Sequence, residues 1–260
     1  FDAIFATYGP FGSLWLGRHL KKLSPSATLV SDIRDTIVLP DILPTVEATL
    51  RSEQRKTVNK SDLVTVVSDG IRNEMLQQSK IRRHADKIHV LRNGFQRRHI
   101  EGMHENTGER PLRIVYTGQI YGTGQDPSPL FKSIAHIKEA KPNLSFEVHY
   151  AGNQGHRMID AARAYGLEAV VIDHGPLSHP DALALQGSSD VLLVLSWNRS
   201  DSQGIISGKF GEYLAMEKPL LVLVSGDLPG AELTELVDRL SVGYVYEEAS
   251  SSDIMALTRF

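Results

Sequence analysis

The sequence contains no cysteine among its 260 residues. This absence excludes disulfide bonds, thiolate metal sites and a cysteine nucleophile within the chain. Long hydrophobic runs are also missing, because VLLVL (191–195) and PLLVLV (219–224) are far too short to span a bilayer. The ten histidines lack the His-Glu-x-x-His spacing of zinc hydrolases. Asp-x-Asp, which metal-dependent sugar-nucleotide sites use, is absent as well. We therefore expect no metal site.

The charge of the chain is close to balanced, with a net charge of −3 and a pI near 6.4. Nothing in this balance predicts a general attraction to nucleic acid. A hydrophobic content of 41% is typical of a globular protein, and 260 residues are enough for two domains. No signal peptide is visible, and the sequence begins with Phe1 rather than Met. We expect it to be part of a longer protein that lacks the start of its first domain and its C-terminal end.

Short apolar runs alternate with longer amphipathic segments along the whole chain. The apolar runs do not alternate strictly with polar residues, which is typical of parallel strands buried on both faces. A polar stretch at 96–111 interrupts the series. The pattern predicts an α/β fold with two Rossmann-like, doubly wound parallel-sheet domains that face each other across a cleft. We expect the domains to be residues 1–105 and 106–260.

Individual elements can be placed from the same patterns. Residues 12–23 have the composition and periodicity of a helix, and residues 112–118 form an apolar run typical of a strand. Ser178 stands three residues before Asp181, a spacing that resembles a capping box and predicts a helix start.

Ligands of such sheets bind beyond the carboxyl ends of the strands, so the residues that follow predicted strands are the candidates. The loop GQIYGTG (118–124) follows the strand predicted at 112–118, and its glycines can present N–H groups to a phosphate. The dinucleotide-binding fingerprint Gly-x-Gly-x-x-Gly requires a third glycine three residues after the second. After Gly122 and Gly124 that position is Pro127, so we exclude nicotinamide binding. The alternative is a flexible turn.

A second candidate is the segment SGKFGEYL (207–214), which precedes another apolar run. It is not a triphosphate-binding loop, because only three residues separate Gly204 from Gly208 and Phe210 follows the lysine. Ser207 and Gly208 instead open a predicted helix, whose N-terminus favours an anion.

Lys209 and Glu212 lie three residues apart and share one face of this predicted helix. A cation beside a carboxylate suits a sugar nucleotide, with the lysine on the diphosphate and the glutamate on the ribose hydroxyls. The alternative is an ordinary surface ion pair.

In the first half, Asp32 and Arg34 stand at the end of the strand predicted at 27–32. A carboxylate and a guanidinium at a strand end can serve as a base and an anion clamp. The alternative, which we favour, is a structural Asp–Arg pair that caps the next segment.

GIISGKFGEYLAMEKPLLVLV (204–224) resembles the signature region of the group-1 (family 4) glycosyltransferases, which have the two-domain GT-B fold. ATYGPFGSLWLGRHL and LVSDIRD resemble the acceptor domain of these enzymes, and LRIVYTGQIYG and DHGPLSHPDALALQGSSDVLLVL resemble their donor domain. The ordered set covers nearly all of the chain.

The resemblance implies retaining transfer of a sugar from a nucleoside-diphosphate sugar without a metal or other cofactor. Glu212 matches the family's ribose-binding glutamate, whereas the first glutamate of the motif falls on Gly204. The family's diphosphate-binding arginine and lysine fall on Gln119 and Gly124, and we hypothesise that Lys209 supplies the missing charge. The donor-binding residues expected are Gly118, Gln119, Ser207, Gly208, Lys209 and Glu212, and the catalytic candidates are Asp32 and Arg34.

The implied partners are a nucleotide-sugar donor and a glycan or lipid-linked acceptor, with no nucleic acid. The expected location is the cytoplasm or the cytoplasmic face of the membrane, with any peripheral membrane contact through the missing N-terminal part. Two alternatives remain open: a sugar-nucleotide epimerase on the same fold, and a catalytically degenerate binding or partner subunit.

Overall fold

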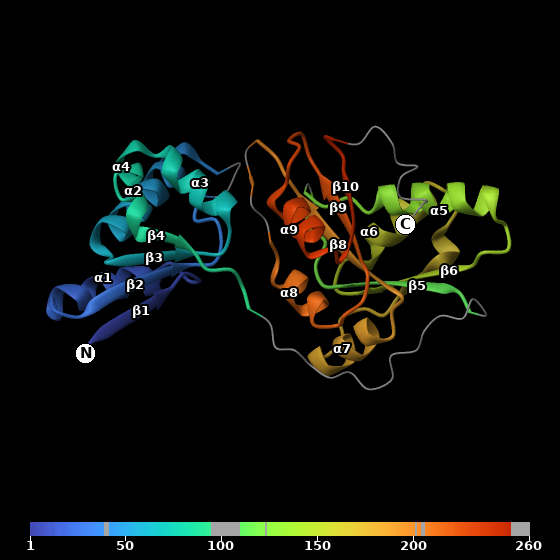
Figure 1. Ribbon diagram of the computed structural model, residues 1–260, viewed down its shortest axis with the longest axis horizontal. Helices are drawn as coiled ribbons and strands as arrows, with labels where there is room; N and C mark the ends of the chain where they lie inside the picture. Colours follow the sequence, from blue (N-terminus) through green and yellow to red (C-terminus); the bar gives the residue numbers. More distant parts are fainter. Residues whose placement is uncertain (39–41, 95–109, 123, 201, 204–205, 251–260) are drawn as a thin grey trace. The chain divides into compact units, whose positions relative to one another are not determined.

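The computed structural model describes residues 1–38, 42–94, 110–122, 124–200, 202–203 and 206–250. The chain divides into two compact units, the first mainly Phe1–Asn93 and the second Gly94–Ser200 with Ser207–Phe260. The predicted boundary between residues 105 and 106 lies outside the described residues. Each unit is an α/β structure built on one parallel sheet, which confirms the predicted fold class (Figure 1).

The first unit has a four-stranded parallel sheet in the order β1-β2-β3-β4. In β2, Leu29 and Ile33 lie on the same face of the sheet and are both fully buried in the core of this unit. The elements are β1 (Ala3–Thr7), α1 (Gly12–Leu23), β2 (Thr28–Ile33), α2 (Pro44–Lys60), β3 (Leu63–Val66), α3 (Asp69–Gln77), α4 (Ser79–Arg82), the 3-10 turn η1 (Ala85–Lys87) and β4 (Ile88–Val90).

The second unit has a six-stranded parallel sheet in the order β10-β9-β8-β5-β6-β7. The elements are β5 (Leu112–Thr117), α5 (Ser128–Ala140), β6 (Phe146–Ala151), α6 (Gly155–Arg163), η2 (Glu168–Val170), β7 (Val171–Asp173), α7 (His179–Gly187), β8 (Val191–Trp197), α8 (Gly208–Leu214), β9 (Leu220–Ser225), α9 (Glu232–Leu240) and β10 (Gly243–Glu247). The strand order reverses between β5 and β8, so the carboxyl ends of these two strands form the switch point at which doubly wound sheets bind ligands.

The two faces of this sheet are covered by different helices. Ile114 and Tyr116 of β5 pack in one hydrophobic cluster with Phe131 of α5 and Met158 of α6. Thr117 is the next residue along β5 and therefore points to the other face. Its hydrogen bonds to side chains of α7 and α8 show that these two helices lie there. The switch point is thus bordered by α8 on the face that Thr117 occupies.

The starts and ends of the helices follow from local chemistry. Ser178 caps α7, since its side chain accepts a hydrogen bond from the N–H of Asp181, as the sequence predicts. The helix that opens at Gly208 is short and ends at Leu214. Glu217 has a φ of 54°, and Pro219 follows two residues later, so the chain cannot continue the helix here.

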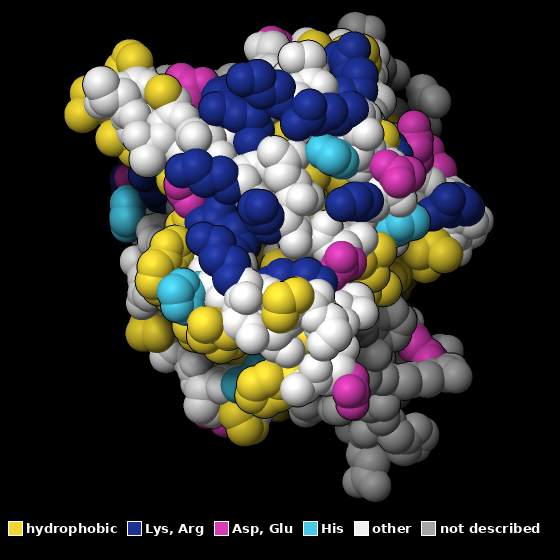
Figure 2. All heavy atoms as spheres, turned by 90° about the vertical axis from the view of Figure 1, so that its left-hand side faces the viewer, with side chains coloured by type: hydrophobic (Ala, Val, Ile, Leu, Met, Phe, Trp, Pro, Cys, Tyr) yellow, Lys and Arg dark blue, Asp and Glu magenta, His cyan; other side chains and the backbone are white. Residues whose placement is uncertain are grey.

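Lysine and arginine side chains gather on one face of the first unit (Figure 2). Residues 1–93 carry 14 lysines and arginines against 10 aspartates and glutamates, a net charge of +4. Residues 94–260 carry 14 against 21, a net charge of −7. The small net charge of the whole chain is therefore the sum of a positive first part and a negative second part.

Candidate functional site

The loop that follows β5 begins with Gly118, and any other residue at this position would force the side chain of Lys209 to move. Gly118 has a φ of +119°, and a Cβ built on it would lie 2.0 Å from Cε and 2.2 Å from Nζ of Lys209. Lys209 is in the first turn of α8, which precedes β9. Two predicted site residues that are 91 positions apart in the sequence therefore lie against each other at the switch point.

The ammonium group of Lys209 is half-buried, and its pKa is lowered by that burial, against a partial opposing effect of the Glu212 charge. Among the described residues it makes no hydrogen bond or ion pair, so the predicted surface ion pair with Glu212 does not form. An ammonium that has lost water without gaining a partner favours an anion in the space beside it.

Glu212, one turn further along α8, has one oxygen occupied and the other available. Its Oε1 accepts a hydrogen bond of 2.6 Å from Nε2 of Gln186, and its Oε2 lies 3.9 Å from Nδ1 of His179. The side chain is 31% exposed, so a ligand can reach it. Lys209 and Glu212 together offer a positive and a negative group on one side of the switch point.

A buried polar network beneath Glu212 was not predicted from the sequence. Gln186 in α7 is fully buried and also donates a 2.8 Å hydrogen bond to Oγ1 of Thr117. The hydroxyl of Tyr213, also fully buried, accepts a hydrogen bond of 2.9 Å from the N–H of Thr117. The network joins the end of β5 to α7 and α8. No sequence motif identifies Gln186. The only signal is its position in an apolar helical segment, because a polar side chain buried there needs hydrogen-bond partners.

The backbone of the 118–124 loop is held by side chains of the neighbouring strands. The hydroxyl of Tyr150 donates to the carbonyl of Gly118 at 2.9 Å, and that of Tyr116 donates to the carbonyl of Gln119 at 2.7 Å. The predicted alternative of a flexible turn is therefore not favoured for the start of this loop. The side chain of Gln119 itself is exposed.

The end of the loop explains one departure from the family pattern. A Cβ on Gly124 would lie 2.9 Å from the ring of Trp197 at the end of β8, so a lysine cannot stand at this position without moving the ring. Arg157 of α6 reaches the same loop and donates a hydrogen bond of 3.2 Å to the carbonyl of Gly122. Sequence reasoning missed this arginine, which places a second cation beside the loop.

Ser207 and Gly208 stand where the sequence predicts, at the start of α8. Ser207 is the N-cap residue by backbone geometry, but its side chain makes no capping hydrogen bond. Gly208 is exposed, with open space where a Cβ would be. Gly204, the position of the missing first glutamate, lies outside the described residues.

Asp32 and Arg34, in the first unit, form a hydrogen-bonded ion pair of 2.7 Å between Oδ2 and Nε. Oδ1 of Asp32 accepts a 2.6 Å hydrogen bond from Thr65 on the neighbouring strand. The carboxylate is only 2% exposed, whereas the Arg34 side chain is 30% exposed and also reaches Oδ1 of Asn93. With both oxygens occupied, this geometry favours a structural pair over a catalytic base.

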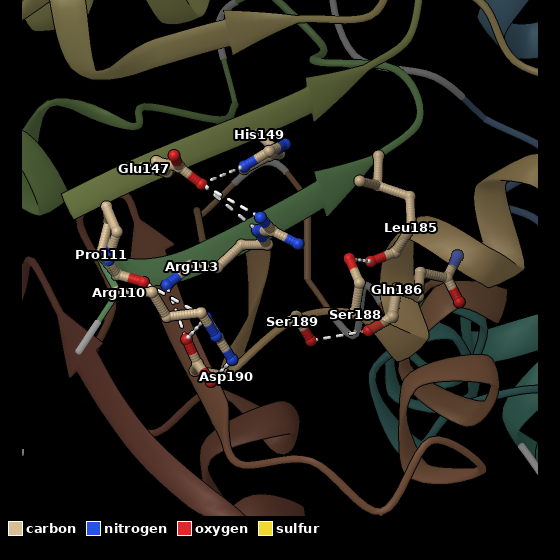
Figure 3. Close-up of polar contacts among 10 residues, drawn as sticks. All are labelled: Arg110, Pro111, Arg113, Glu147, His149, Leu185, Gln186, Ser188, Ser189 and Asp190. Carbon is tan, nitrogen blue, oxygen red and sulfur yellow. Dashed lines mark hydrogen bonds and ion pairs between the residues drawn. The ribbon is translucent and has the colours of Figure 1, made fainter. Parts of the chain in front are cut away.

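A further polar cluster lies on the sheet face that carries Thr117 (Figure 3). Glu147 binds Arg113 and lies 3.0 Å from Nε2 of His149, and these hydrogen bonds, led by that from His149, lower its pKa. Nδ1 of His149 lies 2.9 Å from Nε2 of His174. Burial lowers the pKa of His149, against the opposing effect of the Glu147 carboxylate. None of these residues contacts Lys209 or Glu212 through a hydrogen bond.

Other site types are not found in the described part of the chain. No group of three or more histidine, aspartate or glutamate side chains there is arranged to hold a metal ion. None of the helices in the described ranges is long and apolar enough to cross a membrane. A surface cavity of about 560 Å³ lies beside Leu214 and Val242. It is lined by none of the predicted site residues, so we assign no ligand to it.

No protein family and no curated protein matches the sequence. Several solved structures, however, are similar to the chain. The chain is similar to the lipopolysaccharide outer core galactosyltransferase WaaB, with 16% identity, 98% of this chain and 64% of WaaB covered, and a TM-score of 0.60. It is also similar to WaaG, a glycosyltransferase involved in lipopolysaccharide biosynthesis, with 12% identity, coverage of 100% and 75%, and a TM-score of 0.62. The chain has the GT-B fold.

The GT-B fold predicted from the sequence is thus confirmed, and the chain spans only part of the length of each of these proteins. The fold does not define the reaction. A UDP-N-acetylglucosamine 2-epimerase candidate from Listeria monocytogenes matches with 16% identity, coverage of 99% and 64%, and a TM-score of 0.52. Function must therefore be argued from the site.

Proposed function

We propose that this chain is the donor-binding and acceptor-side core of a glycosyltransferase that uses a nucleoside-diphosphate sugar. The reaction is retaining and metal-independent, and the acceptor is a glycan or a lipid-linked saccharide of polysaccharide or glycoconjugate biosynthesis. The donor binds at the carboxyl ends of β5 and β8. The similarity to WaaB and WaaG supports this class of reaction.

The observation that carries the proposal is the unpartnered, half-buried ammonium of Lys209, packed on Gly118 within the described part of the chain. The donor diphosphate lies beside this ammonium and the loop that begins at Gly118. Glu212 accepts hydrogen bonds from the ribose hydroxyls through Oε2, which accepts no hydrogen bond from the described residues and has only the 3.9 Å contact with His179. The cation is in place before the reaction, so it stabilises the charge that develops on the leaving diphosphate.

A thermal-shift panel of UDP, GDP, dTDP and their sugars tests this assignment. A ligand that binds the folded state adds about 2.7 kcal/mol of stability at a hundredfold excess over its Kd. We expect one nucleotide class to raise the melting temperature, and its Kd to rise at least tenfold in Lys209→Met, because a hydrogen bond to a charged group is worth about 1.5–3 kcal/mol.

Lys132→Met is the matched control, since Lys132 is an exposed lysine on α5 of the same unit. It should leave the nucleotide affinity unchanged. Lys209→Met should not lower the melting temperature without ligand, because it removes a buried charge that has no partner among the described residues. Equal nucleotide affinity in the wild type and Lys209→Met would contradict the proposal.

The second candidate is a sugar-nucleotide epimerase, which the Listeria structure favours. Product analysis separates the two, because an epimerase converts the sugar nucleotide without an acceptor, whereas a transferase releases the nucleoside diphosphate. A binding subunit without activity, suggested by Gly204, Gln119 and Gly124, would show neither product.

A further inference from the structure

Gln186 connects three elements at the base of the candidate site. It stands near the end of α7, beside the serines that terminate the helix (Figure 3). Its Nε2 donates to Oε1 of Glu212 at 2.6 Å and to Oγ1 of Thr117 at 2.8 Å. Because Thr117 is itself bound to the hydroxyl of Tyr213, the amide is anchored to the end of β5 while it holds the carboxylate on α8.

The orientation of the amide follows from its partners. Rotating it by 180° would turn its oxygen toward Oε1 of Glu212, and two acceptors would then face each other at 2.6 Å. The nitrogen must therefore face Glu212. In this orientation Oε1 of Gln186 is buried and, among the described residues, has no hydrogen-bond partner.

An unpaired buried acceptor lowers stability, because it has lost its hydrogen bonds to water and gained none from the protein. An apolar side chain of the same length would avoid this cost, so the stability of α7 does not explain why glutamine stands at position 186. The glutamine instead acts on the carboxylate of Glu212, to which it donates a hydrogen bond. With Oε1 occupied by Gln186, Oε2 is the oxygen that accepts a hydrogen bond from a ligand.

We propose that Gln186 is a positioning residue that fixes the Glu212 carboxylate to receive the vicinal hydroxyls of a ribonucleotide. This inference rests on the proposed nucleotide-sugar function. Gln186 does not touch the ligand; it restrains the rotation of Glu212 and keeps Oε2 directed into the site. The loss of Gln186 should therefore weaken recognition of the ribose and leave recognition of the diphosphate intact.

The test compares two ligands on two variants. The probes are UDP or GDP, whichever binds the wild type, and the corresponding 2′,3′-dideoxy nucleotide, measured by calorimetry. Gln186→Met should lower the affinity for the ribonucleotide about tenfold, as expected for loss of about 1.4 kcal/mol. Its affinity for the dideoxy form should stay within about twofold, the range of a small indirect change.

Ser189→Ala is the matched control. The buried Ser189 hydroxyl donates a 2.7 Å hydrogen bond to the backbone carbonyl of Gln186, so this variant disturbs the same end of α7 without touching Glu212. It should change neither affinity. Equal losses for both ligands in Gln186→Met would mean a structural role and would overturn the inference.

Gln186→Glu provides a second readout that does not depend on how well Gln186→Met folds. Two carboxyl groups then face each other and share a proton at low pH, which restores the hydrogen bond to Glu212. As pH rises the shared proton is lost, the two charges repel and Glu212 moves. His179 of α7 and Lys209 of α8 face the same carboxylate in the wild type and in the variant, so the wild-type pH profile is the reference. Relative to that profile, the preference for the ribonucleotide over the dideoxy form should fall between about pH 6 and 9 in Gln186→Glu.

The outcomes separate the two claims. If the wild type binds no nucleoside diphosphate, the proposed function fails and this inference fails with it. If the wild type binds and Lys209→Met weakens binding, the function stands. An unchanged ribose preference in both Gln186 variants, or no ribose preference in the wild type, would then reject the role of Gln186 only.

Discussion

Gly118 and Lys209 occupy interlocking positions, with the lysine side chain passing where a β-carbon of residue 118 would be. The glycine supplies both the φ of +119° and the space for the ammonium group. The loop after β5 and the first turn of α8 are therefore one structural unit. This relationship ties the predicted phosphate loop to the predicted cation.

Gly118→Ala should damage both stability and binding. A non-glycine residue at this backbone conformation costs about 1–3 kcal/mol, and the new methyl group displaces the Lys209 side chain. We expect a lower free energy of unfolding in urea and a weaker nucleotide affinity.

Gly12→Ala serves as the control, because Gly12 is the first residue of α1 and no atom lies within 4 Å of the position that the added methyl group would take. It should change the free energy of unfolding by less than about 0.5 kcal/mol. If Gly118→Ala matched this control in stability and retained nucleotide affinity, the interlocking arrangement would be wrong.

Asp32→Asn should act on stability rather than on chemistry. The buried carboxylate accepts from Thr65 and Arg34, and an amide cannot accept both hydrogen bonds with the same geometry. We expect a loss of about 1–3 kcal/mol, measured by urea unfolding, with unchanged transfer per folded molecule. Asp35→Asn, at an exposed position, should be neutral. A stable Asp32→Asn protein without activity would instead identify a catalytic base.

Glu247 should make the second unit less stable in acid. Burial alone raises the pKa of this carboxylate, but hydrogen bonds from Thr234, Ser250 and the amides of Ala231 and Gly230 outweigh burial and lower it. Below about 4.5, the ordinary value, the unfolded chain therefore binds more protons than the folded one. The stabilisation is present above that pH and is lost as pH falls through the lowered pKa.

Denaturant unfolding of Glu247→Gln between about pH 3 and 7 measures this contribution. The variant should be less stable than the wild type near neutral pH, and the difference should shrink as pH falls. Glu235→Gln, on the exposed side of α9, should follow the wild-type profile. A constant difference over the whole range would show that the Glu247 charge is not involved.

Some of this structure follows from local sequence. The helix predicted at 12–23 is α1, Gly12–Leu23, and the strand predicted at 112–118 is β5, Leu112–Thr117. The predicted cap of α7 at Ser178 is present as well. These features depend on hydrophobic periodicity and on hydrogen bonds between residues a few positions apart, and a sequence displays both directly.

The arrangement of Asp32 shows where local reasoning stops. The spacing of Asp32 and Arg34 allows either a base with an anion clamp or a structural pair. The deciding contact is the hydrogen bond from Thr65, which lies 33 residues away on the adjacent strand. Strand pairing brings it close, and nothing in the pattern around Asp32 specifies that partner.

The sequence by itself determined the α/β class and the placement of Lys209 and Glu212 on a helix that precedes an apolar strand. Only the tertiary structure decided that Lys209 packs on Gly118, that Trp197 excludes a lysine at Gly124, and that Gln186 holds Glu212. The reason is physical: periodicity encodes which face of an element is buried, whereas the pairing of buried polar groups depends on which elements meet. Gln186 and Thr117 are 69 residues apart, and the switch of strand order between β5 and β8 brings them together.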